Sequence, residues 1–317
     1  MVRVSIVVTT YNRLPLLKRA VESALAQTYP CEVVIADDGS TDGTEDYVKS
    51  LGDRVVYHRN SVNSGHSATV NAGVRLATGD WIKPLDDDDY LASNCIEEMV
   101  QAIAGCPQAV IFSCQAIQVD VNGVEISRTH LGDSSKAFYV PQEDIHYGML
   151  MEMVPFGTPV QVAFAKDAFV KSGGWDSAFD GNCDDIESWI RIAQFGDAVF
   201  LNQCLAYRTV WPGGISKQLS IQKRLEKNIL IKEKIYQLVD EKYKDDIPAI
   251  KDIRAYLRLH WSLVAVKHKQ FLTALKIGYP VVFSPVAWIS LTRVLYSRNI
   301  KCKDNYVRKD VVSYETA

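Results

Sequence analysis

Apolar runs alternate with amphipathic segments along the first 90 residues of the chain. The run Val4–Thr9 is almost wholly apolar and β-branched, which predicts a strand buried on both faces. Similar runs predict strands at 31–36, 54–58 and 81–85. Between the strands, apolar positions three and four residues apart predict helices. We expect these helices after Asn12, from Asp42 to Leu51 and from Ser67 to Ala77.

The order of these elements predicts how they assemble. Strands that alternate with helices at this spacing form a parallel sheet with right-handed crossovers. In such sheets, ligands bind beyond the carboxyl ends of the strands. Polar residues are also placed to begin the helices. Asn12 can cap the first helix, and Asp42 with Glu45 resembles a capping box for the second.

The pattern changes after residue 93. A hairpin with a tight primed turn is expected over Val119–Ile126, around Asn122-Gly123. The other expected elements are helices at about 93–104 and 186–194, and strands at 109–114, 160–165 and 198–206. From residue 218 onward the pattern is helical. We therefore predict an α/β domain over 1–217 and a helical C-terminal region over 218–317, which would contact an acceptor or a membrane surface.

Charge is distributed unevenly between those two regions. Although the net charge is −3, residues 217–317 carry 20 Lys and Arg against 10 Asp and Glu, and residues 1–216 carry 15 against 28. The basic tail suits an anionic partner such as a membrane surface or a polyanionic acceptor, or it is simply a solvated helical tail. The acidic body would need a metal cation to hold an anionic ligand. No nucleic-acid partner is expected.

Neither a disulfide framework nor a membrane span is predicted. The 7 cysteines are scattered without a Cys-x-x-Cys pair, which suits a reducing cytosol. The N-terminus lacks the features of a secretory signal. The most apolar segment, Ile277–Tyr296, is interrupted by Pro280, Pro285 and Arg293, so we expect it to be interfacial or buried. These features predict a cytoplasmic protein that can also lie at the inner face of a membrane.

Two acidic clusters directly follow predicted strands. A carboxylate of Asp37-Asp38-Gly39-Ser40 can accept a hydrogen bond from the imide of uracil or from ribose hydroxyls, although an Asp-Gly turn with a helix cap explains the same residues. The four carboxylates of Asp86–Asp89 would raise one another's pKa unless a cation neutralised them. Oxygen ligands suit Mg²⁺ or Mn²⁺, which can bridge the phosphates of a nucleotide sugar; a solvated acidic loop is the alternative. Asp86 and Asp88 would face one way on an extended segment.

A third acidic group stands at the start of a predicted helix. Asp184 or Asp185 could be a general base that takes the proton of an acceptor hydroxyl. Helix capping alone would also explain both residues. The two acidic clusters at the strand ends favour the catalytic interpretation.

Several short motifs occur in a fixed order over about residues 1–215. They are Ser5–Arg13, Asp37–Asp42, Asn63-Ser64-Gly65, Asn71-Ala72-Gly73, Gly79–Ile82 before the acidic cluster, Gly173–Asp176, and the acid pair before Trp189 and Arg191. The ordered set resembles the family 2 inverting glycosyltransferases of the GT-A fold. The resemblance implies a Rossmann-like, mostly parallel central sheet flanked by helices, and it does not extend to residues 218–317.

The resemblance also implies roles for the matching residues. The donor-binding residues would be Thr9, Tyr11, Arg13, Asp37, Asp38, Asn63, Gly65, Asn71, Asp86 and Asp87. Asp38 would contact a pyrimidine base. Asp88 and Asp86 would be the ligands of Mn²⁺ or Mg²⁺. Asp185 would be the catalytic base, with Asp184 beside it.

The chain departs from the family pattern at three places. Family members usually have Glu-Asp where this chain has Asp184-Asp185, which leaves open which carboxylate is the base. Because all four residues of Asp86–Asp89 are acidic, the register of the metal motif is ambiguous by one position. Many members have a His after the last strand, where this chain has Arg208, so Arg208 would make the metal or diphosphate contact, or that contact would be absent. Ser216-Lys217 resembles a loop that closes over the diphosphate.

The function implied is inverting transfer of a sugar from a nucleotide-diphosphate donor, with UDP preferred, to a hydroxyl of a saccharide or lipid-linked acceptor. Such a hexosyltransferase would act in polysaccharide or glycoconjugate synthesis. A sugar-phosphate nucleotidyltransferase is an alternative, although the segment Thr9–Arg13 lacks the glycines of its phosphate loop. A phosphoacceptor receiver domain is disfavoured because its acidic doublet follows the first strand. A catalytically inactive nucleotide-sugar-binding protein is the other alternative. The donor sugar, the acceptor and the oligomeric state stay open.

Overall fold

A computed structural model describes residues 2–129, 137–154, 156–181, 183–211, 219–279, 281–299 and 308–310. The chain forms two compact units. The first comprises Met1–Gln142, Pro155–Pro212 and Arg308–Ala317, and the second comprises Glu143–Val154 and Gly213–Val307. The domain boundary predicted at residue 217 lies outside the described residues, and so does the predicted Ser216-Lys217 loop.

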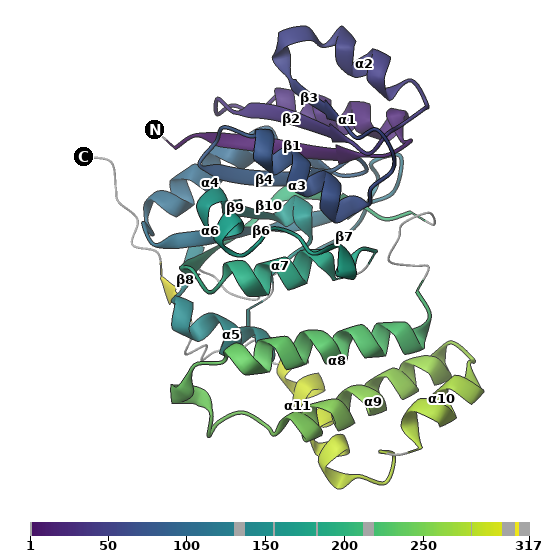
Figure 1. Cartoon of the computed structure of the whole chain (residues 1–317). Coiled ribbons are helices and arrows are strands. Elements are labelled where there is room, and N and C mark those ends of the chain that lie inside the picture. Colours follow the sequence, from purple (N-terminus) through teal and green to yellow (C-terminus); the bar gives the residue numbers. More distant parts are fainter. Residues whose placement is uncertain are drawn as a thin grey trace. The chain divides into compact units, whose positions relative to one another are not determined.

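The first unit is a central sheet with helices on both faces (Figure 1). The strand order is β11-β8-β10-β6-β9-β4-β1-β2-β3, with β5 beside β10 and β7 beside β6. The strands are β1 (Val4–Thr10), β2 (Glu32–Asp37), β3 (Val56–Arg59), β4 (Trp81–Asp86), β5 (Tyr90–Leu91), β6 (Ala109–Val119), β7 (Glu125–Arg128), β8 (Ala137–Val140), β9 (Val162–Ala165), β10 (Asp197–Thr209) and β11 (Lys309–Asp310). The helices are α1 (Leu14–Leu25), α2 (Thr44–Ser50), α3 (His66–Leu76), α4 (Cys95–Ala104), α6 (Lys166–Lys171) and α7 (Asp184–Ile192), with short 3₁₀ turns η1 (Gly52–Arg54), η2 (Pro159–Gln161) and η3 (Ser177–Phe179). The predicted α/β fold is confirmed.

The half of the sheet around β1 is parallel, as predicted. β1 pairs in parallel with β2 and β4, and β2 pairs in parallel with β3. The other half is mixed, because β9 runs antiparallel to both β4 and β6. β10 is parallel to β6 and antiparallel to β8. The carboxyl ends of β1, β2 and β4 therefore meet at one edge, where both acidic clusters follow.

β1 is buried on both faces, as its apolar sequence predicts. Ile6 and Val8 belong to the main hydrophobic cluster, which also includes residues of α1 and α4. Val7 faces α3 on the other side, where a Cβ atom on Gly73 would collide with the Val7 side chain. The absence of a side chain at Gly73 lets α3 pack closely on the sheet, and this brings the start of α3 to the site.

One buried charge connects β4 to the turn before β9. Lys83 is fully buried, and its ammonium donates hydrogen bonds to the carbonyls of Pro159 at 3.0 Å and Val162 at 2.9 Å. Burial lowers the pKa of Lys83. The ammonium therefore fixes the antiparallel β9 against the parallel part of the sheet.

Two predicted helix caps are wrong. Asn12 has a φ of 52° and its side-chain oxygen accepts a hydrogen bond from the Thr41 amide at 2.8 Å, so it does not cap α1. The Leu14 amide at the start of α1 instead donates to Asp42 at 2.8 Å. Asp42 and Glu45 form no capping box, because α2 has no side-chain cap. These side chains connect the loop after β1 to the loop after β2, and so fix both parts of the site.

The predicted hairpin after β6 exists and its turn is tight, since the Gly123 amide donates to the Asp120 carbonyl at 3.0 Å. β6 and β7 pair antiparallel, with Val119 opposite Glu125. The Asp120 carboxylate accepts hydrogen bonds from the amides of Asn122 and Val124, both at 2.9 Å. The prediction of a primed turn is wrong, because Val121 and Asn122 at the centre of the turn are not among the described residues with a positive φ.

The second unit is helical, as predicted for the C-terminal region. It contains most of α5 (Gln142–Leu150), together with α8 (Ile221–Leu238), η5 (Glu241–Tyr243), α9 (Ile250–Lys267), α10 (Phe271–Gly278) and α11 (Pro285–Asn299). Lys232 of α8 donates to the Leu150 carbonyl at 2.7 Å. Tyr243 stacks on Tyr147 with ring centroids 4.0 Å apart. Within the described residues, no helix has the length and apolar character needed to cross a bilayer.

Candidate active site

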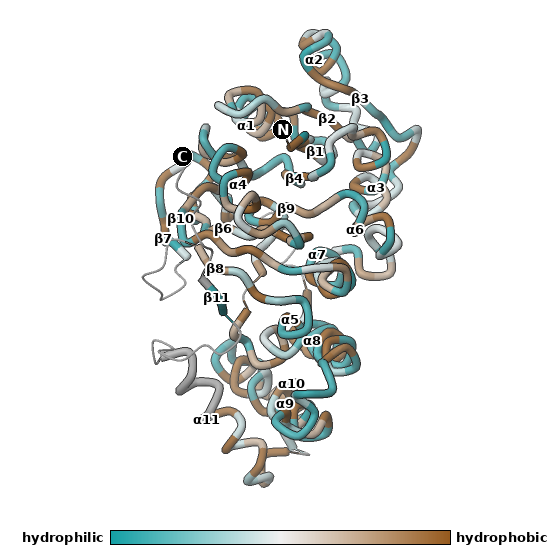
Figure 2. Tube along the Cα trace, turned by 90° about the vertical axis from the view of Figure 1, so that its left-hand side faces the viewer, coloured by the Kyte–Doolittle hydropathy of each residue, from teal (hydrophilic) through white to brown (hydrophobic). Residues whose placement is uncertain are grey.

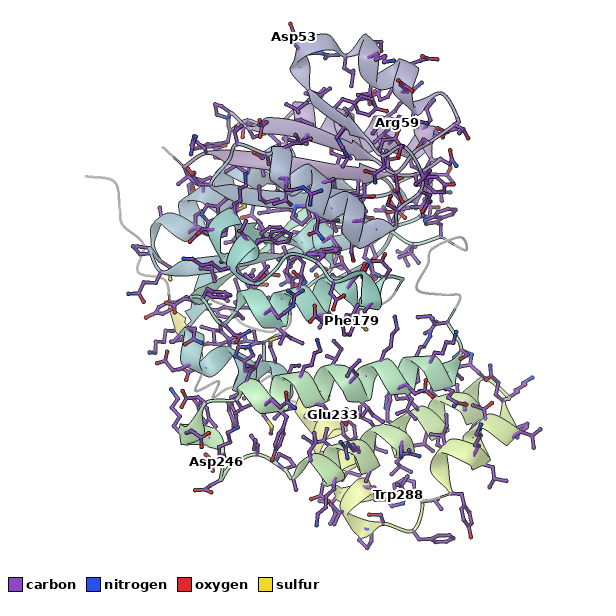
Figure 3. The ribbon with its side chains drawn as sticks, in the orientation of Figure 1. Asp53, Arg59, Phe179, Glu233, Asp246 and Trp288 are labelled. Atoms are coloured by element: carbon purple, nitrogen blue, oxygen red, sulfur yellow. The ribbon has the colours of Figure 1, made fainter. Side chains whose placement is uncertain are left out.

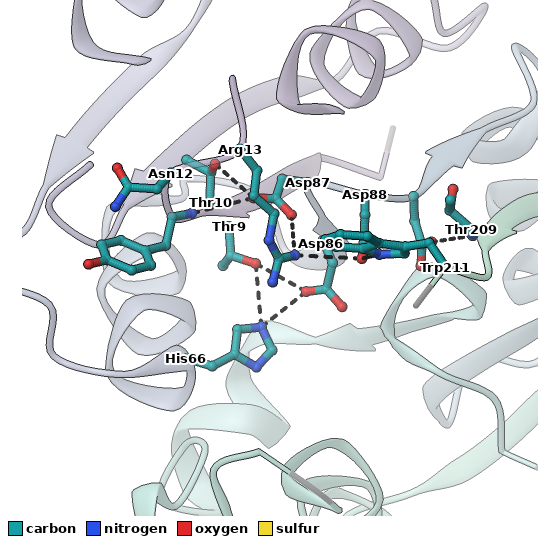
Figure 4. Close-up of polar contacts among 12 residues, drawn as sticks. Thr9, Thr10, Asn12, Arg13, His66, Asp86, Asp87, Asp88, Thr209 and Trp211 are labelled. Carbon is teal, nitrogen blue, oxygen red and sulfur yellow. Dashed lines mark hydrogen bonds and ion pairs between the residues drawn. The ribbon is translucent and has the colours of Figure 1, made fainter. Parts of the chain in front are cut away.

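The loop after β1 is bonded to Asp87. Thr10 donates to one Asp87 oxygen at 2.9 Å, the Tyr11 amide donates to the same oxygen at 3.3 Å, and Arg13 donates to the other at 2.9 Å (Figure 4). Burial, reinforced by Asp88, raises the pKa of Asp87 to about 6. Both Asp87 oxygens thus have partners within the protein, and Asp87 orients Tyr11 and Arg13.

His66 connects the acidic cluster after β4 to the acid pair of α7. Its Nε2 lies 3.0 Å from an oxygen of Asp86, and its Nδ1 lies 2.9 Å from an oxygen of Asp184. Thr9 donates to the same Asp86 oxygen at 3.1 Å (Figure 4). The His66 ring also meets Trp175 edge to face at 5.2 Å between centroids. Two acidic groups about a hundred residues apart in the sequence therefore belong to one site.

The charges of His66, Asp86 and Asp184 stabilise one another. Burial opposes protonation of His66, but the carboxylates of Asp86 and Asp184 raise its pKa well above the usual value. Burial alone would raise the pKa of Asp86, but His66 and Thr9 lower it. The contacts therefore favour an ionised Asp86 paired with a protonated His66.

Asp88 and Asp89 lie against the end of β10. The Trp211 indole donates to Asp88 at 2.9 Å, and the Thr209 amide donates to Asp89 at 2.7 Å. Arg13 lies 3.5 Å from Asp88 and stacks over the Trp211 ring. Burial first, and then the neighbouring carboxylates, raise the pKa of Asp88, and of Asp89 still more. Crowding of the predicted kind is present and favours binding of a cation.

Asp37 and Asp38 are buried and bonded within the protein. Asp37 accepts from the Ser40 amide and from the Tyr57 hydroxyl, both at 2.8 Å. Asp38 accepts from the Ser64 amide at 2.7 Å and the Gly65 amide at 3.0 Å, and from the Asn60 side chain at 2.8 Å. Asp38 thus holds the loop over 60–65 against the carboxyl end of β2, whereas Asp37 holds the turn at Ser40 and the Tyr57 side chain of β3.

The other predicted donor-site residues differ in their surroundings. Asn63 is exposed, and Gly65 has a φ of 91° beside the Asp180 carboxylate, which would collide with any side chain there. Asp180 accepts from the Ser67 amide at 3.0 Å and so stabilises the start of α3. Asn71 exchanges two hydrogen bonds of 2.9 Å with the Trp175 backbone. Asn71 therefore orders the Gly173–Asp176 turn.

Asp184 and Asp185 have different hydrogen-bond partners. Both stand in the first turn of α7, but Asp184 is bonded to His66 whereas Asp185 accepts only from the Ile186 amide of its own turn, at 2.7 Å, among the hydrogen bonds of the described residues. Burial and the negative charge of Asp184 raise the pKa of Asp185 to about 7. A carboxylate whose pKa lies near neutral pH is suited to take and return a proton.

Arg208 stands near the end of β10, opposite Gln118 of β6. Its positive charge lowers the pKa of Asp89, against the larger effect of burial. Arg208 is thus close enough to the acidic cluster to act on it electrostatically. The resemblance implies that Arg208 contacts the metal or the diphosphate, and that contact stays a prediction.

The residues fit a divalent cation that is held partly by substrate. Within the described residues, no cluster of three or more His, Cys, Asp or Glu side chains could hold a metal ion by itself. The raised pKa of Asp88 and its crowded neighbours nevertheless suit a cation there. Mg²⁺ characteristically takes one or two carboxylates and completes its ligands with substrate phosphates and water. Asp88 and Asp86 would provide such carboxylates.

The sequence analysis missed His66 and Trp211. His66 directly follows the Asn63-Ser64-Gly65 motif, and Trp211 follows shortly after Arg208. Both residues therefore lie close to positions that the motifs mark. Nothing in local spacing indicated that they would contact Asp86 or Asp88. Those contacts depend on the sheet order.

Comparison with known families identifies the family to which the chain belongs. The family model described as Glycosyl transferase family 2 matches residues 5–171, more than half of the chain. The chain is a member of glycosyltransferase family 2. The family match spans the β1 loop, both strand-end acidic clusters and His66, and ends before the acid pair of α7.

Relatives of this family 2 glycosyltransferase include full-length and partial matches. It is 26% identical over 297 residues to the glucosyl-dolichyl phosphate glucuronosyltransferase of Haloferax volcanii, covering 83% of this chain and 94% of that protein. It is 36% identical over 99 residues to the UDP-Glc:alpha-D-GlcNAc-diphosphoundecaprenol beta-1,3-glucosyltransferase WfaP of Escherichia coli, covering 31% of this chain and 39% of that protein. The matches support a glycosyltransferase activity.

Solved structures confirm the GT-A fold of this glycosyltransferase. TarS 1-349 of S. aureus in complex with UDP-GlcNAc aligns with a TM-score of 0.61 at 14% identity, covering 87% of this chain and 90% of that one. The mannosyltransferase PcManGT from Pyrobaculum calidifontis, in complex with GDP-Man and Mn²⁺, aligns with a TM-score of 0.56 at 20% identity, covering 94% and 81%. At these identities the likeness concerns the fold alone.

Proposed function

We propose that this enzyme transfers a sugar, with inversion at the anomeric carbon, from a UDP-sugar to a hydroxyl of a lipid-linked or saccharide acceptor. The observation that carries the proposal is the bridge through His66, which joins Asp86 of the strand-end cluster to Asp184 of α7. A displacement needs a group beside the leaving diphosphate and a base on the opposite side of the sugar. The bridge brings candidates for both into one site.

UDP is the donor nucleotide that the likenesses favour. One structural neighbour was solved with UDP-GlcNAc, and the WfaP relative is named for UDP-Glc, whereas another neighbour was solved with GDP-Man. Tyr11 is half-exposed next to the ordered β1 loop, so its ring is available to stack on a base. Thr9, Arg13, Asn63 and the Asp38-bonded loop would form the rest of the nucleotide site.

Asp185 is our candidate for the general base. It would deprotonate the acceptor hydroxyl while that oxygen attacks the sugar carbon. Asp184 is less suited because one of its oxygens is already bonded to His66 at 2.9 Å. We therefore assign Asp184 the role of orienting His66 and keeping the pKa of Asp185 high.

Asp88 and Asp86 would hold Mn²⁺ or Mg²⁺ together with the donor diphosphate. A bound divalent cation would offset the negative charge that grows on the leaving group. His66 would keep Asp86 ionised and oriented, so that it acts as a positioning residue. Arg13 and Arg208 would add positive charge near the phosphates.

The relatives' names suggest the acceptor class. One is named for glucosyl-dolichyl phosphate and another for a diphosphoundecaprenol-linked sugar. By analogy we propose a lipid-linked saccharide as the acceptor, and action at the cytoplasmic face of a membrane in glycoconjugate synthesis.

A thermal-shift panel of UDP- and GDP-sugars, each with and without Mn²⁺, tests the donor and metal assignments. We expect stabilisation by UDP-sugars that depends on the cation, because a ligand that binds only the folded state raises the melting temperature. Nuclear magnetic resonance of the transferred sugar then gives the stereochemistry. Net retention would exclude a single displacement.

The two rival functions make different predictions in the same assays. A nucleotidyltransferase would release pyrophosphate from a nucleoside triphosphate and a sugar phosphate. An inactive binding protein would be stabilised by a nucleotide sugar but would neither transfer nor hydrolyse it. Release of UDP with formation of a new glycosidic bond favours the proposed function over both.

A further inference from the structure

The helices α10 and α11 and the segment between them present large hydrophobic side chains to solvent. Leu272 is 86% exposed, Phe283 85%, Tyr279 69% and Phe271 65%. We name as the apolar face Phe271, Leu272, Leu275, Tyr279, Phe283 and Ile289, all of which are exposed. Figure 2 shows the hydrophobic stretches of this region in brown. Soluble proteins rarely expose so many large apolar side chains together, and where they do the surface usually binds a partner.

The apolar face is not left over from an incomplete core. α10 already packs on α9 through its other side, where Ala274, Ile277 and Gly278 are buried. The Ser262 hydroxyl of α9 donates to the Ala274 carbonyl at 2.9 Å, and a Cβ on Gly278 would collide with Ser262. The buried side of α10 thus carries the small residues that close packing needs. Phe271, Leu272 and Leu275 of the same helix are instead exposed.

The segment of the chain that carries this face has charges of a single sign. Residues 253–303 contain no Asp or Glu, but they contain nine Lys and Arg. Lys267, Lys269 and Lys276 are exposed in and beside α10. Trp288 of α11 is half-exposed, and its indole donates to the Val282 carbonyl at 2.8 Å (Figure 3). Aromatic and aliphatic side chains surrounded by lysine are the composition of helices that lie in a membrane interface.

We propose that the apolar face docks on an anionic lipid bilayer. The large side chains would enter the boundary between headgroups and acyl chains, while Lys267, Lys269 and Lys276 would meet lipid phosphates. A second copy of the chain suits the face less well, because it would bring together two copies of a segment that carries lysine and arginine and no carboxylate. No helix of the described residues is able to span the bilayer, which is consistent with a contact at the surface only.

Sedimentation of the full-length protein with vesicles tests the proposal. We use vesicles of phosphatidylcholine alone and vesicles that also contain phosphatidylglycerol, without donor or acceptor. The protein should bind the anionic vesicles at low salt, bind them less as salt rises, and bind phosphatidylcholine weakly. The double variant Leu272→Ser with Phe283→Ser should lower the vesicle partition coefficient roughly tenfold or more, because two insertions are lost.

Val170→Ser is the matched control, since Val170 is 63% exposed on α6 in the other unit. It should leave vesicle binding unchanged. Circular dichroism and thermal melting should show all variants folded, because each replaced side chain is exposed. The proposal is overturned if the parent protein does not bind anionic vesicles, or if the double variant binds as well as the parent. It is also overturned if the double variant instead dissociates a dimer in sedimentation velocity while the parent ignores vesicles.

The vesicle assay is independent of the proposed enzymatic reaction. If the protein binds vesicles but transfers no sugar, the docking proposal is supported and the proposed function is refuted. If it transfers sugar to a water-soluble acceptor but does not bind vesicles, the proposed function is supported and the docking proposal is refuted. The two proposals therefore fail separately.

Discussion

The first unit buries carboxylates, whereas the second, helical unit exposes large hydrophobic side chains. Asp37, Asp38, Asp87 and Asp89 are almost inaccessible to solvent at the edge of the sheet. In the helical unit, Leu272 and Phe283 are among the most exposed apolar residues of the described chain. Both arrangements oppose the usual distribution of polar residues outside and apolar residues inside.

The buried carboxylates and the exposed hydrophobic side chains differ in whether the protein itself supplies them with partners. Each buried carboxylate accepts hydrogen bonds within the protein, as when Asp38 accepts three from the 60–65 loop. Buried charges that lacked such partners would strongly destabilise the fold. The exposed apolar face of the helical unit lacks a comparable partner among the described residues. The hydrogen bonds of the acidic region thus lie within the protein, whereas for the apolar face of the helical region we propose an external partner.

The largest expected effect is loss of catalysis when the candidate base is removed. Asp185→Asn should lower the transfer rate roughly 10²–10⁴-fold, because no other side chain would take the acceptor's proton. Donor binding in the thermal-shift assay should stay close to that of the parent protein. Asp167→Asn, on the exposed side of α6, is the control with unchanged rate. A near-normal rate in Asp185→Asn would reject the assignment of the base.

Loss of the His66 bridge should have the next largest effect. His66→Ala should lower kcat roughly 10–100-fold, as is typical when a partner that orients a metal-binding carboxylate is removed. His66→Gln should recover part of the rate, since an amide can still bond to Asp86 or Asp184. The kinetics measure kcat and KM separately. If both variants behaved like the parent, the bridge would have only a structural role or none.

Stability should distinguish the two units directly. Asp38→Ala should reduce the free energy of unfolding by roughly 1–3 kcal/mol, because it leaves buried amides without an acceptor. Leu272→Ala should leave it nearly unchanged, because the side chain is exposed. Urea denaturation followed by circular dichroism gives both values. Asp53→Ala, at an exposed position (Figure 3), is the control for loss of a carboxylate. A destabilised Leu272→Ala would mean that the apolar face belongs to the core.

The smallest expected effect is a shift of the pH profile. Because burial and Asp184 raise the pKa of Asp185 to about 7, the transfer rate should rise with pH through about 7 as Asp185 loses its proton. Asp184→Asn removes a neighbouring negative charge, so it should lower the pKa of Asp185 and move the midpoint to lower pH. The measurement is kcat against pH at saturating donor. A midpoint that moves to higher pH would contradict the electrostatic explanation.

Much of the fold and the identity of the acidic groups could be predicted from local sequence. The buried run Val4–Thr9 and the acidic residues after β2 and β4 were found because strand burial and charge are visible in the order of residues. The helix caps were predicted wrongly, because Asn12 and Asp42 bond across two loops that are distant in the chain. His66 was missed for the same reason, since its partners are distant in sequence and meet only in the sheet.

The sequence by itself determined that strands alternate with helices, that acidic residues gather at strand ends, and that the C-terminal region is basic and helical. Those features depend on periodicity, spacing and charge, which neighbouring residues establish among themselves. Tertiary structure alone decided which carboxylates are buried and support loops, and that Asp86 and Asp184 share one histidine. It also decided that α10 packs on α9 through Ala274 and Gly278 and leaves Leu272 exposed. Each of these depends on contacts between segments far apart in the chain, and the order of the strands and the packing of α9 against α10 bring those segments together.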